Sequence, residues 1–263
     1  MQHHDPFSAP AQVRQIMTDR PYYLGNHPQR RQALNHFKRI LFKIKEQNPY
    51  YIGVHLAYAR ILRDLGETAE ARAIYEFVEK HPNASFRYHW NTYLCHGICL
   101  SEENEETAAV AILKKITDFD KNVVPLSLQP TTTLLAEAHN AIAVTYMKQE
   151  EFNLSCWHFK KATMLNPVYA PAWSGLGKVY QNGYQLNKNP NLKKKAEECF
   201  AKAKDFSPPR YKQLHPPQDP PLPLVQTALT KTGASHLLFQ KKKKPDFDLN
   251  SLDDFPKLSL RRG

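Results

Sequence analysis

Apolar residues recur every three to four positions through most of the first 208 residues, which is the spacing of one face of an α-helix. Residues 32–49 have the pattern of a single amphipathic helix. Residues 52–82 predict two helices, because Gly66 lies between two such patterns and suits the end of the first. The pattern therefore predicts an all-α chain of consecutive helices.

The stretch AWSGLGKVY, residues 172–180, belongs to an internal repeat. Its residues Trp173, Leu176, Gly177 and Tyr180 correspond to residues 34 positions earlier, which are His139, Ile142, Ala143 and Tyr146. Later in each unit the spacing is also kept, with about seven inserted residues in the last unit. These later positions are Ser155, Phe159, Ala162 and Pro167 in one unit and Ala196, Phe200, Ala203 and Pro208 in the next.

This pattern resembles the tetratricopeptide repeat (TPR), a 34-residue pair of antiparallel helices. In that repeat, small residues let the two helices approach, large residues fill the space between units, and proline ends the second helix. The resemblance implies a TPR-like α-solenoid over residues 30–208, with units near 52–85, 90–122, 136–169 and 170–208. The match to the repeat pattern is closest in residues 136–208 and is also good in residues 52–82. Gly177 is then room for a helix contact rather than a catalytic residue.

The segments outside this domain have other compositions. Residues 1–29 are expected to be irregular, 209–224 to be a proline-rich linker, and 225–263 to hold a short helix and a disordered charged tail. Apolar residues recur among the tail's aspartates, namely Phe247, Leu249, Leu252, Phe255 and Leu258. They predict either a segment that docks on a partner or a tail that only solubilises the chain.

Charge and composition argue against a membrane-spanning or secreted protein. The net charge of +11 comes from residues 1–50, 188–212 and 241–263, whereas the central body is slightly acidic. No apolar run is long enough for a membrane span, and the start does not resemble a secretory signal. We therefore expect a cytoplasmic protein, or a nuclear one if its source is eukaryotic. The four cysteines predict buried thiols, although Cys95, His96 and Cys99 also have the spacing of half a metal site.

The sequence offers little chemistry and one candidate surface. No phosphate-binding loop, nucleophile motif or metal motif is present, so we expect no catalytic residues, metal or cofactor. By the resemblance, the first helix of each unit lines a concave groove. The groove positions are Leu56, Arg60, Arg63, Asn91, Leu94, Ile98, Ser101, Glu137, Asn140, Val144, Met147, Ser174, Lys178 and Gln181. These positions predict a peptide-binding surface or, more simply, solvated helix faces.

These observations favour a non-catalytic protein-interaction adaptor or assembly subunit. Its groove would bind an extended or helical segment of a partner, and its tail would dock on a second partner or on its own array. The alternative is a subunit associated with RNA or DNA through basic patches such as Lys193–Lys195 and Lys241–Lys244. An enzyme would need a polar pocket between helices, for which the sequence gives no pointer.

Overall fold

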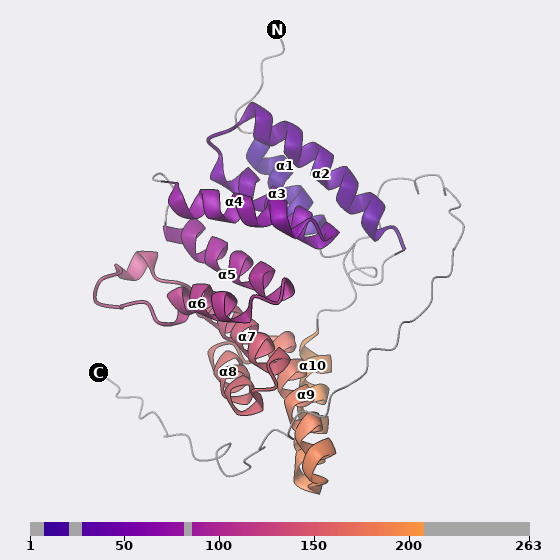
Figure 1. Cartoon of the computed structure of the whole chain (residues 1–263). Helices are drawn as coiled ribbons and strands as arrows, with labels where there is room; N and C mark the ends of the chain where they lie inside the picture. Colours follow the sequence, from indigo (N-terminus) through magenta and orange to yellow (C-terminus); the bar gives the residue numbers. More distant parts are fainter. Residues whose placement is uncertain (1–7, 21–27, 82–85, 208–263) are drawn as a thin grey trace. The chain divides into compact units, whose positions relative to one another are not determined.

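The computed structural model describes residues 8–20, 28–81 and 86–207. The linker at 209–224, the short helix and the tail with its five apolar residues lie outside the described residues. Within them the chain is all-helical (Figure 1). The helices are α1 (Ser8–Asp19), α2 (Arg30–Gln47), α3 (Ile52–Leu65), α4 (Thr68–Lys80), α5 (Phe86–Glu102), α6 (Glu106–Thr117), α7 (Thr132–Lys148), α8 (Phe152–Leu165), α9 (Ala170–Asn187) and α10 (Pro190–Phe206).

Consecutive helices form the pairs that the repeat predicts. Helices α3 and α4, α5 and α6, α7 and α8, and α9 and α10 pack against each other as pairs. Two of them begin before the predicted unit starts at 90 and 136, since α5 begins at Phe86 and α7 at Thr132. The first helices α3, α5, α7 and α9 also contact one another in succession, and each second helix packs on the first helix of the next unit. Figure 1 shows this stacking along the chain. We call the surface formed by the first helices the first-helix face.

The expectation that residues 1–29 are irregular is wrong for Ser8–Asp19, which form α1. This helix packs on α2 and α3. Val13 and Ile16 are 6% and 5% exposed in the same core cluster as α3, and Met17 packs against that cluster. These three apolar residues have helical spacing, so the short segment can bury one face on the first repeat.

Small residues lie where the paired helices approach most closely. A Cβ atom on Gly177 would lie 2.7 Å from the ring of Phe200 on α10, and one on Gly97 would lie 2.5 Å from Leu113 on α6. Ala143 occupies the corresponding position of α7 and is fully buried. The repeat's packing explanation for Gly177 is therefore confirmed.

Two local features set the helix lengths. Gly66 ends α3 with a positive φ of 86°, as expected for a glycine at this position. The inserted residues of the last unit lengthen α9 as far as Asn187, and Lys188 ends it in a left-handed conformation. Pro190 then begins α10, with the side chain of Asn189 accepting a hydrogen bond from the Asn191 N–H.

The long connection between α6 and α7 contains a short 3-10 turn, Leu126–Leu128. It is fastened to α5, because the Trp90 indole N–H donates to the Leu128 carbonyl at 2.8 Å. Gln129 donates from its side chain to the Val124 carbonyl at 2.9 Å. Since α6 and α5 both still pack on α7, the array continues across this connection.

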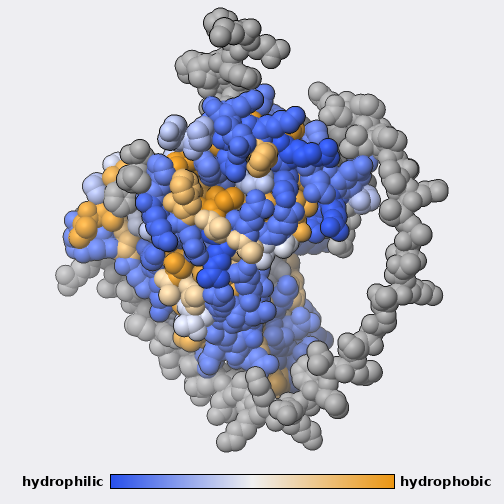
Figure 2. Space-filling model, turned by 45° about the horizontal axis from the view of Figure 1, so that its top comes forward, coloured by the Kyte–Doolittle hydropathy of each residue, from blue (hydrophilic) through white to orange (hydrophobic). Residues whose placement is uncertain are grey.

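The surface of the described residues is predominantly polar on the face seen in Figure 2, where hydrophobic side chains gather in a band between hydrophilic areas. Large hydrophobic side chains that are exposed include Phe42 on α2 at 45% and Leu126 in the connection at 85%. Single exposed apolar side chains of this kind are common on protein surfaces.

Candidate partner-binding site

The predicted groove residues all lie on the first helices, but their side chains differ in solvent exposure. Leu56 is only 7% exposed and belongs to the core cluster around α3. Val144 and Met147 are partly buried and pack against the cluster around α9. Lys178 and Gln181 are exposed on α9. Leu94 and Ser101 on α5 are buried, at 5% and 6% exposed. The remaining predicted residues are half-buried, and these are Arg60, Arg63, Asn91, Ile98, Glu137, Asn140 and Ser174.

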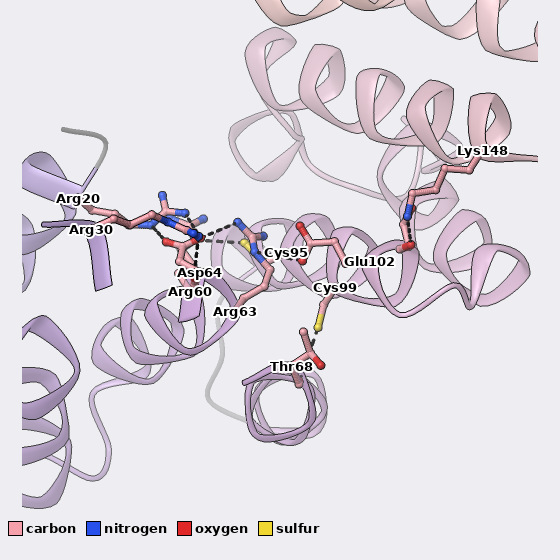
Figure 3. Close-up of polar contacts among 11 residues, drawn as sticks. Arg20, Arg30, Arg60, Arg63, Asp64, Thr68, Cys95, Cys99, Glu102 and Lys148 are labelled. Atoms are coloured by element: carbon pink, nitrogen blue, oxygen red, sulfur yellow. Dashed lines mark hydrogen bonds and ion pairs between the residues drawn. The ribbon is translucent and has the colours of Figure 1, made fainter. Parts of the chain in front are cut away.

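Asp64, at the end of α3, collects several cations on this face. The Arg20 guanidinium donates two hydrogen bonds to its carboxylate, one of them at 2.8 Å. Arg30 donates to the Asp64 backbone carbonyl at 2.6 Å, and both arginines point toward Asp64 in Figure 3. Arg63 lies 3.6 Å from the Asp64 carboxylate and 3.9 Å from that of Glu102 on α5. Arg63 therefore links two first helices and is already occupied.

Arg60 is also engaged within the protein. Its guanidinium donates to Cys95 Sγ at 3.1 Å and to Asn91 Oδ1 at 3.4 Å, both on α5. The next first helices are linked in a similar way, because Lys148 of α7 donates to the Ser101 carbonyl of α5. Much of the predicted groove is thus a set of contacts that hold successive first helices together.

A pocket of about 450 Å³ opens between α5 and α7. Trp90 and Asn91 of α5 form one side, Thr133, Leu134 and Glu137 of α7 form another, and the connection from Ser127 to Thr131 closes it. The hydrogen bond from Trp90 to Leu128 holds that wall in place. Thr131 fixes the start of α7 by accepting a hydrogen bond from the Leu134 N–H at 3.2 Å.

Two acceptors on α7 are left without a donor among the described residues. No hydrogen bond or ion pair there involves the Glu137 carboxylate, whose pKa is raised by burial and lowered to a smaller extent by nearby Arg60. Asn140 lies one turn further along, and its Oδ1 atom is buried without a hydrogen-bond partner. The half-buried Glu137 carboxylate is the acceptor that a ligand's N–H group can reach, because it lines the pocket, whereas the Asn140 Oδ1 atom is enclosed by the protein.

The environment of Glu137 includes an aromatic hydroxyl. Burial raises the pKa of Tyr169 to about 12, and the Glu137 carboxylate contributes in the same direction. Tyr169 comes just before α9, so the field of Glu137 extends toward the last unit.

The wall of this pocket was missed by the sequence analysis, which took Asn91 and Glu137 but not Trp90 or residues 127–131. Asp64 was missed as well. Trp90 offered a signal, because a tryptophan at the start of a unit needs a partner for its indole N–H. The partner itself, a backbone carbonyl 38 residues away, could not be identified from spacing.

The titratable groups of the described residues do not form a metal site. All four cysteines are buried free thiols, and within the described ranges no group of three or more His, Cys, Asp or Glu residues could hold a metal ion. His96 Nδ1 contacts the Glu79 carboxylate at 2.5 Å. Among the same residues, no helix has the length and apolar character needed to cross a membrane.

Comparisons with known proteins gave structural matches only. No protein-family model matches the chain, and no curated protein sequence matches it. MamA from Desulfovibrio magneticus RS-1 is 16% identical at a TM-score of 0.46, covering 74% of this chain and 94% of that one. A further MamA structure is 16% identical at a TM-score of 0.45, covering 66% of this chain and 89% of that one.

YrrB, which is described as a TPR protein with an unusual peptide-binding site, is 17% identical at a TM-score of 0.41. That match covers 70% of this chain and 83% of YrrB. Within the chain itself, helix pairs recur, small residues lie at the helix contacts, and the first helices contact one another in succession. The described part of this chain is therefore a TPR-like α-solenoid.

Proposed function

We propose that this protein is a non-catalytic protein-interaction adaptor that binds an extended segment of a partner on its first-helix face. In this proposal a cationic group of the partner, such as a lysine or arginine side chain, enters the pocket between α5 and α7 and pairs with Glu137. The observation that supports it is the half-buried Glu137 carboxylate, which has no donor among the described residues and lies one turn from the unpaired Asn140 Oδ1.

The geometry favours a peptide over a compact ligand. The pocket volume of about 450 Å³ accommodates one or two side chains. Glu137 offers an acceptor in the pocket, and the exposed Lys178 and Gln181 continue the face on α9. An extended segment presents N–H groups and side chains at regular intervals, so it can use these positions together.

Charge argues against a nucleic acid at this pocket. Phosphates placed here would face the Glu137 carboxylate, while the nearest cation, Arg60, is engaged by Cys95 and Asn91. The nucleic-acid alternative would have to use basic residues elsewhere, such as those of α2 or α10. We therefore propose protein recognition for the first-helix face.

The test is a binding assay with an array of extended peptides in which one position is Lys, Arg, norleucine or Glu. Peptides with Lys or Arg should bind the full chain preferentially, and Glu137→Gln should weaken them by about tenfold or more, because the buried carboxylate supplies the pairing charge. Glu197→Gln, an exposed position on α10, is the matched control and should bind as wild type.

Two results would overturn the proposal. One is equal binding of the Lys, norleucine and Glu peptides. The other is unchanged affinity of the Glu137→Gln protein for a Lys peptide that does bind. Circular dichroism of both variants establishes that the compared proteins have the same helix content.

A further inference from the structure

A second groove lies on the side of the second helices, between α2 and α4. It has a volume of about 810 Å³ and is floored by Tyr58 of α3, on which both flanking helices pack. Its α2 wall contains Lys38, Arg39, Phe42 and Lys43. None of its lining residues belongs to the proposed site on the first-helix face.

The groove combines an aromatic surface with uncompensated positive charge. Phe42 is 45% exposed, and the Lys45 ammonium lies 5.0 Å from its ring centroid and 5.3 Å from that of Tyr58. Among the described residues, no ion pair involves Arg39 or Lys43, and both side chains are exposed.

The carboxylates at the groove already have contacts within the protein. Lys38 pairs with Glu67, and Glu70 accepts a hydrogen bond from the Tyr58 hydroxyl at 3.2 Å. Glu70 keeps its negative charge, because the hydroxyl is neutral, but Arg39 and Lys43 together outweigh it and leave a net positive rim around the exposed Phe42 ring. An occupant that fits carries carboxylates close to aromatic or aliphatic side chains.

The chain itself contains such a segment. Residues 246–255 have the sequence DFDLNSLDDF, in which aspartates alternate with Phe247, Leu249, Leu252 and Phe255. The segment lies outside the described residues, and residues 208–245 connect it to the end of the described solenoid. Chain of that length can extend for about 130 Å, several times the ~27 Å length of an 18-residue helix, so reach does not limit docking.

We propose that residues 246–255 bind in the α2–α4 groove of the same chain. Their aspartates pair with Arg39 and Lys43, and an aromatic side chain packs on the exposed ring of Phe42. Covalent connection raises the effective concentration of the segment to the millimolar range, so a weak contact is sufficient. The pocket on the first-helix face suits these aspartates less, because the cation near Glu137 in the described residues is the engaged Arg60, whereas Arg39 and Lys43 outweigh Glu70 in the α2–α4 groove. The groove is then closed to other acidic partners until they displace the tail.

The experiment is zero-length carboxyl–amine cross-linking of the full chain, followed by mass spectrometry. A mixture of ¹⁴N- and ¹⁵N-labelled protein distinguishes links within one chain from links between chains. We expect cross-links to Lys43 or Lys45 from Asp246, Asp248, Asp253 or Asp254, and we expect both linked peptides to carry the same nitrogen isotope. Arg39→Glu should reduce these links by about tenfold, because it reverses a charge at the rim without removing a cross-linking amine.

Lys193→Glu on α10 is the matched control, since it reverses an exposed charge in another basic cluster. It should leave the links to Lys43 unchanged, and so should Glu137→Gln. The Glu137→Gln result separates this proposal from that for the first-helix face. A tail variant with Phe247 and Phe255 changed to serine should lose the links while keeping all four aspartates.

Several outcomes would overturn the proposal. Equal links to Lys193–Lys195 would mean unspecific attraction, and isotopically mixed links would mean that the groove joins two copies of the chain. Absence of tail links, together with binding of a short RNA that Arg39→Glu abolishes at 150 mM salt, would assign the groove to nucleic acid.

Discussion

Two histidines are placed where the protein disfavours their charge. His139 Nδ1 lies 2.9 Å from His158 Nδ1, and the two rings pack with Trp157 and Tyr146. Burial lowers the pKa of His139 to about 4 and that of His158 to about 3, and nearby lysines act in the same direction. The fold therefore holds both histidines neutral, as packing residues between α7 and α8.

This pair predicts a loss of stability in mild acid. Because the folded pKa values lie below the ordinary 6.5, the unfolded chain binds protons that the folded chain does not. Stability is then complete above about pH 6.5 and falls as the pH decreases toward the folded values. Between pH 6.5 and 5 the free energy of unfolding should drop by up to about 2 kcal/mol for each histidine.

Urea denaturation across this pH range measures the effect. His158→Asn should flatten the pH dependence, whereas His36→Asn, at an exposed position of α2, should leave it as in wild type. A wild-type stability that stays constant from pH 7 to 5, or an equal slope in His158→Asn, would contradict the assignment.

At the scale of the element, α9 depends on glycines that lack a side chain at two contacts. A Cβ on Gly175 would lie 2.2 Å from the ring of Phe159 on α8, and one on Gly177 would lie 2.7 Å from that of Phe200 on α10. The two glycines lower the helix propensity of α9, but they allow it to pack closely against the helices before and after it.

We predict that Gly177→Ala lowers the free energy of unfolding by about 1–3 kcal/mol, because overpacking outweighs the ~1 kcal/mol gain in helix propensity. Urea denaturation measures the change. Lys178→Ala, exposed on the same helix, should stay within about 0.5 kcal/mol of wild type. A Gly177→Ala protein more stable than wild type would show that the ring of Phe200 moves aside at little cost.

At the scale of the whole described domain, stability is distributed between neighbouring units. Each helix packs almost entirely on the helices next to it in the stack, so a local change is expected to act locally. Asp64 is the clearest junction near the start of the array, because it joins Arg20, at the end of α1, to α3 through a half-buried ion pair.

Asp64→Asn should therefore loosen α1 without unfolding the last units. Loss of this paired charge should cost roughly 2–5 kcal/mol locally and speed amide hydrogen exchange in α1 by about thirtyfold or more. Exchange in α9 and α10 should not change, and Asp205→Asn, exposed on α10, should leave α1 as in wild type. Uniformly faster exchange through all helices would instead mean that the array unfolds as one cooperative unit.

The candidate site was only partly predictable from the sequence. The repeat register placed Arg60, Asn91, Glu137 and Asn140 on one face, and all four are on first helices in the structure. It could not show that Arg60 is engaged by Cys95 while Glu137 has no donor among the described residues. Register gives the direction of a side chain on its helix, whereas its partner depends on distances between helices that are far apart in the chain.

By itself, the sequence determined the helix pairs and their register, because helical periodicity, Gly66, Gly177 and the prolines act through local backbone preference and contacts between adjacent helices. Only the tertiary structure decided that α1 joins the array, that Leu56 is buried, and that a connection wall turns Trp90 and Glu137 into the lining of one pocket. These features arise when elements distant in sequence meet. Burial and the pairing of hydrogen-bond groups depend on contacts between these distant elements. No local sequence pattern therefore predicts them.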